Sequence, residues 1–210
     1  MKKFFAICLM CLSIFSATEA ANLEQDSEIA VMDFGILKRE MEENLSLKDV
    51  GLMTSDYIIE RLIDRKYFNV IDRTHLAEKL QNENLITVGS IPPDDAKKIG
   101  EILSVRYLIY GNVTDVSLAE DNEAVVTVNT VKARIIARII DVQTGKILMV
   151  AKGEGKSESA LLNLDGEATV TIGTKRVSQV SVHNSLKKAS FQAADILIER
   201  LANLESVFIK

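Results

Sequence analysis

The run Val131–Ile139 constrains the fold of this chain more than any other stretch. Its odd positions carry Val, Ala, Ile, Ala and Ile, whereas its even positions include Lys132, Arg134 and Arg138. Alternation with a period of two residues is typical of a β-strand that buries one face and exposes the other to water. We therefore predict a long strand within Ala124–Val142, in an antiparallel sheet.

Two hairpins are predicted around and after this strand. Gly145 supplies the positive φ that a tight turn needs, so the chain is expected to return there as a second antiparallel strand. Residues Glu154–Gly166 carry little pattern and predict no element. The segment Ala168–Val182 predicts another hairpin, which turns near Gly173–Arg176.

The first half of the chain alternates short apolar runs with helical patterns, separated by a polar loop at Gly35–Ser46. Strands are expected at Glu28–Phe34, Tyr67–Asp72 and Val105–Val116, and helices at Leu47–Asp64, Arg73–Asn84 and from Pro92 onward. A final helix is predicted from apolar residues at steps of three and four: Leu186, Ala189, Ala193, Leu197, Leu201 and Leu204. The order β-α-β-α-α-β, followed by antiparallel strands and a C-terminal helix, predicts an α/β (α+β) fold with helices packed on a mixed sheet.

The third predicted helix has a clear start signal. Ser90 precedes Pro92 and Pro93, and proline suits a first helical turn because its missing N–H has no partner there. Two aspartates follow and favour the positive end of the helix. Gly100 lies in the middle of this helix, which predicts a close packing contact there.

The first 20 residues are predicted to be a secretory signal peptide, so residues 21–210 form the mature domain. Lys2 and Lys3 precede an apolar core, Phe4–Phe15, and small residues end at Ala20. The core is too short to span a bilayer, which takes about 20 apolar residues. The alternative is a membrane anchor.

Both cysteines, Cys8 and Cys11, lie inside the predicted signal peptide. The mature chain is therefore expected to hold no disulfide and no thiolate metal site. A lipidated cysteine is an alternative, but bulky residues precede both positions. The full chain has a formal charge of -5, with its charges interspersed and no tryptophan, which argues against nucleic-acid binding.

Asp72, Arg73, Thr74 and His75 form the one local cluster that suggests chemistry. One interpretation is an acid/base site at the carboxyl end of a strand. The favoured one is a helix start, in which Asp72 accepts hydrogen bonds from backbone N–H groups. Under it, the chain has no catalytic residue in this corner.

Other residues give weaker signals. Asp33, Asp72 and Asp115 each follow a strand-like run, and we interpret them as strand-terminating residues. His183 is expected before the last helix, far from His75. With no metal-ligand spacing, phosphate loop or dinucleotide motif, we expect no catalytic residue, no metal and no cofactor.

The order of motifs resembles the curli-secretion CsgG-like family, together with the related LpoB activators of penicillin-binding proteins and the amino-terminal domain of TolB. The resemblance rests on "IAVMDF", "YFNVIDRTHLAEKL", "AKKIGEILSVRYLIYGNVTDV" and "ARIIARIIDVQTGKIL", and it covers Glu28–Lys152. It implies a noncatalytic protein of the periplasm or outer membrane. In channel members of the family, rings of subunits each donate two hairpins to the membrane.

The segments matching those hairpins are Val113–Val131 and Ala168–Val182. A membrane-spanning strand needs about 9–11 residues and aromatic belts, but Gly111–Ser190 contains no Phe, Tyr or Trp. The sequence therefore weighs against membrane insertion.

We expect an exported, non-enzymatic periplasmic protein that acts through contacts with envelope proteins or with itself, in cell-envelope assembly or curli-type secretion. The expected working surface is the polar face of Lys132–Arg138, the flanking hairpins, or an exposed sheet edge. The alternatives are an outer-membrane channel subunit and an LpoB-like activator. An enzyme is a third class, and it would need Asp33, Asp72 and His75 in one cleft.

Overall fold

The computed structural model describes residues 28–37, 49–66, 68–81, 83–121, 128–160, 169–172 and 175–208. The predicted signal peptide and both cysteines lie outside these ranges. Within them the elements are β1 (Glu28–Val31), β2 (Gly35–Ile36), α2 (Val50–Arg65), β3 (Asn69–Val70), α3 (Arg73–Leu80), α4 (Pro93–Leu103), β4 (Tyr107–Asp121), β5 (Val128–Asp141), β6 (Lys146–Ala160), β7 (Thr169–Ile172), β8 (Lys175–Ser178) and α5 (Gln179–Phe208). The predicted α+β fold and its element order are confirmed.

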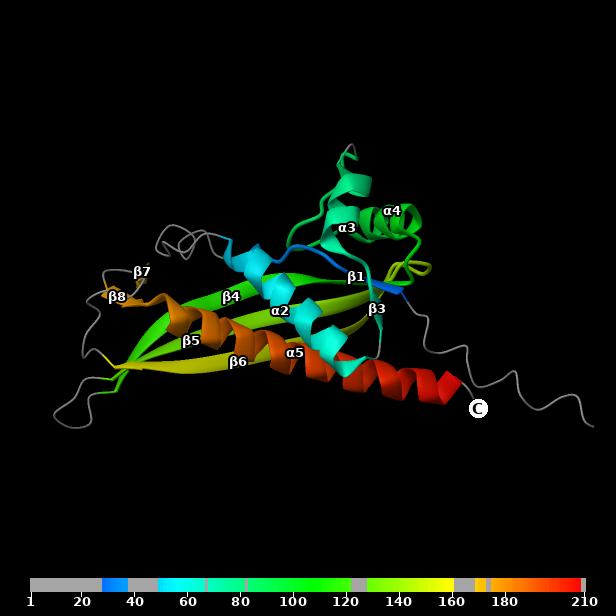
Figure 1. Cartoon of the computed structure of the whole chain (residues 1–210). Helices are drawn as coiled ribbons and strands as arrows, with labels where there is room; N and C mark the ends of the chain where they lie inside the picture. Colours follow the sequence, from blue (N-terminus) through cyan, green and yellow to red (C-terminus); the bar gives the residue numbers. More distant parts are fainter. Residues whose placement is uncertain are drawn as a thin grey trace, which may run out of the picture.

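One mixed sheet with the strand order β3-β1-β4-β5-β6 organises the domain, and β2 also pairs with β4 (Figure 1). The strands from the first half run parallel, whereas β4, β5 and β6 are antiparallel. Gly145 has φ +69° in the turn between β5 and β6, which confirms the turn predicted at this glycine. The strands β7 and β8 form a separate hairpin.

Several predicted boundaries were wrong. The strand β4 runs on to Asp121, so Asp115 does not end it but lies at an irregularity in its pairing with β5. The strand β6 includes Glu154–Ala160, for which no element was predicted. The loop Gly35–Ser46 contains the short strand β2, and its residues from 38 onward lie outside the described ranges.

The last helix also begins earlier than predicted, at Gln179, so His183 lies within α5. Residues 177–182 are rich in valine, which is common in strands, and a hairpin arm was predicted there. Ser181 and Ser185 are buried one helical turn apart, and the Ser185 hydroxyl donates to the Val182 carbonyl at 2.9 Å. Tertiary burial therefore decides this segment over local pattern.

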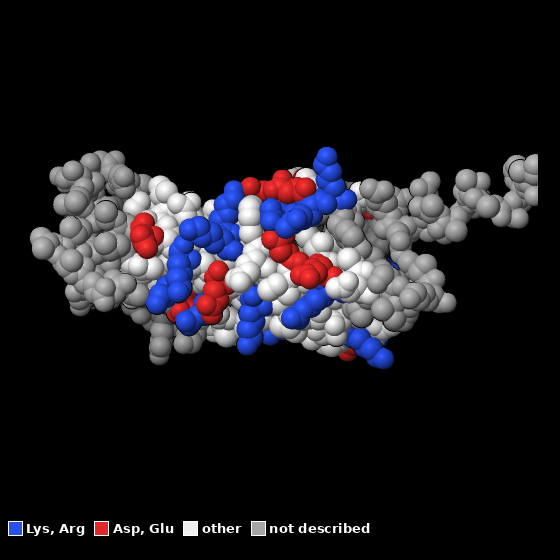
Figure 2. All heavy atoms as spheres, turned by 90° about the horizontal axis from the view of Figure 1, so that it is seen from below, with Lys and Arg blue, Asp and Glu red and all other residues white. Residues whose placement is uncertain are grey.

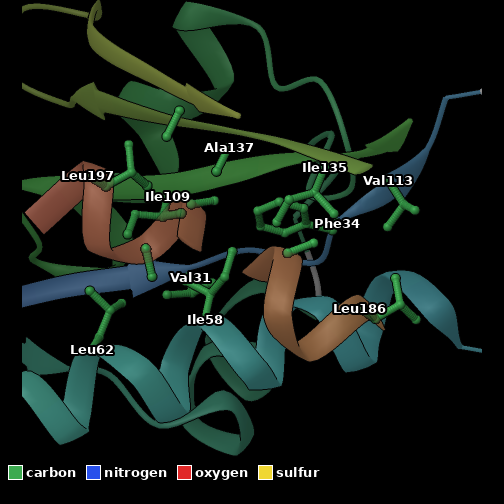
Figure 3. Close-up of a cluster of buried hydrophobic side chains, with 14 of the residues drawn as sticks. Val31, Phe34, Ile58, Leu62, Ile109, Val113, Ile135, Ala137, Leu186 and Leu197 are labelled. Carbon is green, nitrogen blue, oxygen red and sulfur yellow. The ribbon is translucent and has the colours of Figure 1, made fainter. Parts of the chain in front are cut away.

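The larger core lies between one face of the sheet and the helices α2 and α5 (Figure 3). Side chains from β1, β4 and β5 meet side chains of the two helices there. The largest fully buried residues of this core are Ile29, Ile109, Ile135 and Ile139 from the strands and Ile58, Leu62 and Leu186 from the helices. Burial of each such side chain stabilises the fold by about 1.5–3 kcal/mol. This core corresponds to the buried face predicted from the Val131–Ile139 run.

A second, smaller core lies on the opposite face, under α3 and α4. Alternate residues of the strands point into it, among them Met32, Leu108 and Ile140. Gly100 packs against Val142, and a Cβ on this glycine would lie 2.4 Å from the Val142 side chain. The predicted close contact at Gly100 is confirmed.

The helix α5 lies directly on β6 because two glycines of β6 have no side chains. A Cβ on Gly153 would lie 1.8 Å from the Ala189 carbonyl oxygen, and one on Gly155 would lie 1.8 Å from that of Ser185. Both distances are far inside van der Waals contact, so only glycine allows the helix backbone this close approach.

We predict that Gly155→Ala lowers the free energy of unfolding by about 1–3 kcal/mol, because the added Cβ pushes α5 away from the sheet. Urea denaturation measures this change. The matched control is Lys152→Ala on the same strand, which removes an exposed side chain and should change stability by less than about 0.5 kcal/mol. Equal effects of the two substitutions would contradict the close contact.

Candidate functional site

The smaller core covers only one end of its sheet face. On β4 its residues end at Tyr110, and on β5 they begin at Ile140. Further along β4, β5 and β6, no described helix contributes a core residue to this face. We call this area the open face, and define it by the outward side chains of β5 and β6 between Lys132 and Arg138 and their partners Val150–Lys156.

Cross-strand register sets the rows of the open face. The pairs are Lys132 with Lys156, Arg134 with Glu154, Ile136 with Lys152, and Arg138 with Val150. Directly opposite residues of an antiparallel pair point to the same side and lie close enough to interact. The predicted polar face of Lys132–Arg138 is therefore present, and β6 extends it with a second row of charges.

Arg134 is the paired cation of the open face. Its guanidinium bonds the Glu154 carboxylate at 3.2 Å and lies 3.5 Å from the Asp115 carboxylate. The Ser117 hydroxyl also donates to Asp115 at 2.8 Å. Such exposed ion pairs contribute about 0–1 kcal/mol to stability. Their main effect is that the carboxylates of Glu154 and Asp115 are already paired with Arg134.

Arg138 lies at the border between the open face and the helix-covered end. Its Nη1 atom is enclosed and has no hydrogen-bond acceptor among the described residues. Its neighbour across β4 is Tyr110, which is buried. Burial raises the pKa of the Tyr110 phenol, although the Arg138 charge acts in the opposite direction, so this phenol stays neutral and supplies no counter-charge.

Apolar side chains lie beside these charges. Val150 is 40% exposed and Ile147 is 49% exposed, and both lie on the outer strand β6. Arginine is enriched at protein interfaces, and the centres of interfaces are more apolar than the rest of the protein surface.

The edge of the sheet at β6 is guarded. Three side chains of α5 bond its outward backbone groups: Arg200 donates to the Val150 carbonyl at 2.9 Å, Lys188 donates to the Lys156 carbonyl at 2.9 Å, and Gln192 accepts from the Glu154 N–H at 2.7 Å. These groups are the ones that an added strand would need. The expectation of a freely accessible edge therefore does not hold at these three positions of β6.

Asp72 caps α3, as the favoured interpretation predicted. Its carboxylate accepts from the Thr74 N–H at 2.8 Å and from the His75 N–H at 3.3 Å, and its backbone is extended. The His75 and Thr74 N–H groups lower the pKa of Asp72, because they stabilise its ionised form. The side chain is thus engaged in building the helix start.

Arg73 joins three elements in the same corner. It pairs with Asp33, which follows β1, and its Nη1 lies 2.8 Å from the Asp56 carboxylate of α2. It also donates to the Leu52 carbonyl at 3.4 Å. Asp33 therefore faces Arg73, whereas Asp72 is bonded to α3, so the single acidic cleft required by the enzyme interpretation does not form.

The remaining candidates lie apart. Asp115 is on the open face, and His183 lies in α5 with an enclosed Nε2 that has no partner among the described residues. No group of three potential metal ligands occurs within the described ranges. Ser90 does not cap α4 but accepts from Asn112 at 3.3 Å, and Pro92 is the N-cap residue.

Sequence reasoning missed the contribution of β6 to this surface. The signal was present in "KGEGKSE", residues 152–158, where charged residues alternate with Gly and Ser. That alternation has the period of a strand, but glycine and lysine are uncommon in strands, so the pattern was not recognised.

Charges of both signs also lie interspersed on the underside of the molecule. Figure 2 shows Lys and Arg among Asp and Glu across the described part of this face, with no broad area of one sign. None of the described helices is long and apolar enough to cross a bilayer.

Comparison with known proteins gives one family. A model described as "Curli production assembly/transport component CsgG" matches residues 11–205. No curated protein sequence matches the chain.

Solved structures show distant likenesses. The LpoB C-terminal domain from Escherichia coli has a TM-score of 0.41 and 15% identity, covering 61% of this chain and 81% of that chain. The hypothetical protein CT253 from Chlamydia trachomatis has a TM-score of 0.46 and 12% identity, with coverages of 84% and 95%. The PelC dodecamer from Paraburkholderia phytofirmans has a TM-score of 0.42 and 9% identity, with coverages of 81% and 88%.

Asp72→Ala is predicted to lower the melting temperature above about pH 5, because the N–H groups of Thr74 and His75 lose their acceptor. The pKa of Asp72 is lower in the folded state, so its contribution is present above its unfolded pKa of about 3.9 and is lost as pH falls through the folded value. Thermal melts of both proteins across acidic pH should therefore converge. Asp72→Asn is the control, since it caps without titrating.

Removing the three side chains of α5 that bond the β6 backbone should promote self-association. We expect the triple variant Lys188→Ala, Gln192→Ala and Arg200→Ala to sediment as larger species in analytical ultracentrifugation, because it frees three backbone groups of β6. Asn184→Ala with Glu199→Ala, exposed on the same helix, is the control. Sedimentation identical to the unaltered protein would count against the guard.

Proposed function

The chain belongs to the CsgG family, the curli production assembly/transport components, and from this membership we propose that it is an exported, non-enzymatic envelope protein that acts by binding other proteins. Its role lies in cell-envelope assembly or curli-type secretion, in the periplasm. The open face is the contact surface.

The observation that carries this proposal is the incomplete covering of the sheet. One face is packed by α2 and α5 along its length, whereas the helices on the other face stop at Tyr110 and Ile140. The uncovered strands bring together unpaired cations and exposed aliphatic side chains, which a second protein can bury.

Two other surfaces are less suited to the role. The β6 edge is bonded by three side chains of α5, so strand addition would first have to break those contacts. The arms of the β7–β8 hairpin have four residues each, and its turn lies outside the described ranges. A strand that crosses a bilayer needs about 9–11 residues, so this hairpin is too short to cross one. The other segment that resembles a membrane hairpin, Val113–Val131, lies in the long strands β4 and β5, which pair within the sheet of the domain.

Site-specific photo-crosslinking in cells tests the proposal. A photoreactive amino acid at Lys152, in the centre of the open face, should give covalent adducts with a protein of the envelope. The same amino acid at Asn184, exposed on the outer side of α5, is the control and should give none. Adducts at Asn184 but not at Lys152 would overturn the assignment of this face.

Fractionation of the same cells separates this role from that of a channel subunit. A protein that acts by contact in the periplasm is released without detergent, whereas a membrane-inserted subunit needs detergent for extraction. Recovery only in detergent, as ring-shaped oligomers, would favour the channel.

A further inference from the structure

Resting on this proposed function, we propose that the partner presents an acidic segment to the open face, with carboxylates at the Lys132–Lys156 row and at Arg138 and uncharged side chains opposite Glu154 and Val150. Some charges of the open face have partners within the described residues, and those that have none determine which partner the face can bind.

The open face keeps more positive charge than it neutralises. Arg134 engages both Glu154 and Asp115, which leaves Glu158 as the remaining acidic side chain of these rows. Four cations of the face have no ion-pair partner among the described residues: Lys132, Arg138, Lys152 and Lys156. The chain as a whole is acidic, with a formal charge of -5, so this local excess runs against the composition.

Two of these cations lie directly opposite each other. Lys132 on β5 is the register partner of Lys156 on β6, and like charges in this arrangement repel. No acidic side chain within the described residues forms an ion pair with either lysine, although Glu154 and Glu158 lie on neighbouring rows. A carboxylate placed between the two ammonium groups would offset the repulsion, so this row favours the binding of an anion.

Arg138 supplies the second anchoring point. An enclosed guanidinium donor without an acceptor is unfavourable, because it has lost water without gaining a hydrogen bond. A carboxylate that approaches over Val150 pairs with the Arg138 charge through the part of the guanidinium that is not enclosed, which neutral Tyr110 leaves without a counter-charge. Arginine binds carboxylates through two parallel hydrogen bonds, which also fixes the orientation of the partner.

The arrangement of the charges favours a protein over a lipid surface. Lys132 and Arg138 are six residues apart on one strand, or about 20 Å, and the row on β6 alternates Lys152, Glu154 and Lys156. The embedded Glu154 would repel a uniform layer of phosphates, whereas a peptide can place an uncharged residue against it. Exposed Val150 and Ile147 give aliphatic side chains of the same peptide a surface to cover.

Fluorescence anisotropy with a labelled peptide tests the inference on the purified protein. Its alternate residues, which face the sheet when the peptide is extended, are Glu, Leu, Glu, Glu and Leu, with Ser between them. We expect binding, and a loss of at least about tenfold in affinity in the variant Lys152→Glu with Lys156→Glu. The matched control is Lys79→Glu with Lys98→Glu, which makes the same change in net charge at exposed positions of α3 and α4 and should leave affinity within about twofold.

The second arm replaces each Glu of the peptide by Gln, which should also weaken binding by at least about tenfold. Absence of binding by the Glu peptide, or an equal loss in both double variants, overturns the inference. Vesicles of phosphatidylglycerol form the third arm: if they bind, and lose binding in the Lys152→Glu, Lys156→Glu variant alone, the face is a lipid site instead. Adducts at Lys152 in cells together with failure of the peptide would remove the acidic partner but keep the proposed function.

Discussion

The seating of α5 on β6 is the contact on which the rest of the structure depends. Gly153 and Gly155 let the helix backbone approach the strand so closely that the carbonyls of Ala189 and Ser185 occupy the space of side chains. Because the helix lies this close to the sheet, it closes the larger core over Val131–Ile139 of β5 and Met149–Ala151 of β6. The same position brings Lys188, Gln192 and Arg200 to the edge of β6, so one packing contact both fills the core and guards the sheet.

The opposite face of the sheet is covered over only part of its length. The helices α3 and α4 bury only the end that carries Leu108 and Ile140, because α4 is short and its close approach is fixed at Gly100 against Val142. The long strands continue past this layer as a ribbon backed by α5. The open face is therefore a consequence of unequal lengths: strands of 14 and 15 residues are covered on one side by a helix of 30 residues and on the other by one of 11.

Sequence reasoning recovered the parts of the fold that depend on local chemistry. The period-two run identified the buried face of β5, Asp72 identified the start of α3, and Gly145 identified a turn, since each acts through its own or neighbouring residues. It failed where distant packing decides. Residues 154–160 form a strand on which α5 packs closely at Gly155, and residues 179–182 are helical with Ser181 buried in the folded domain. The open face was predicted on β5 alone. Half of its second row, Glu154 and Lys156, lies in the stretch for which no element was predicted.

The distribution of ion pairs separates structure from function in this domain. Where elements pack, charges find partners: Arg61 and Arg65 of α2 hold Asp195 of α5, and Arg73 holds Asp33 and Asp56. Burial alone would raise the pKa of Asp195, but the two arginines outweigh it and lower that pKa, so the carboxylate stays charged within the seam. On the open face the opposite holds, since Lys132, Lys152, Lys156 and Arg138 remain without counter-charges inside the described chain. Pairing of that kind stabilises the seam between α2 and α5. Under the proposed function, the unpaired cations of the open face meet their counter-charges on another molecule.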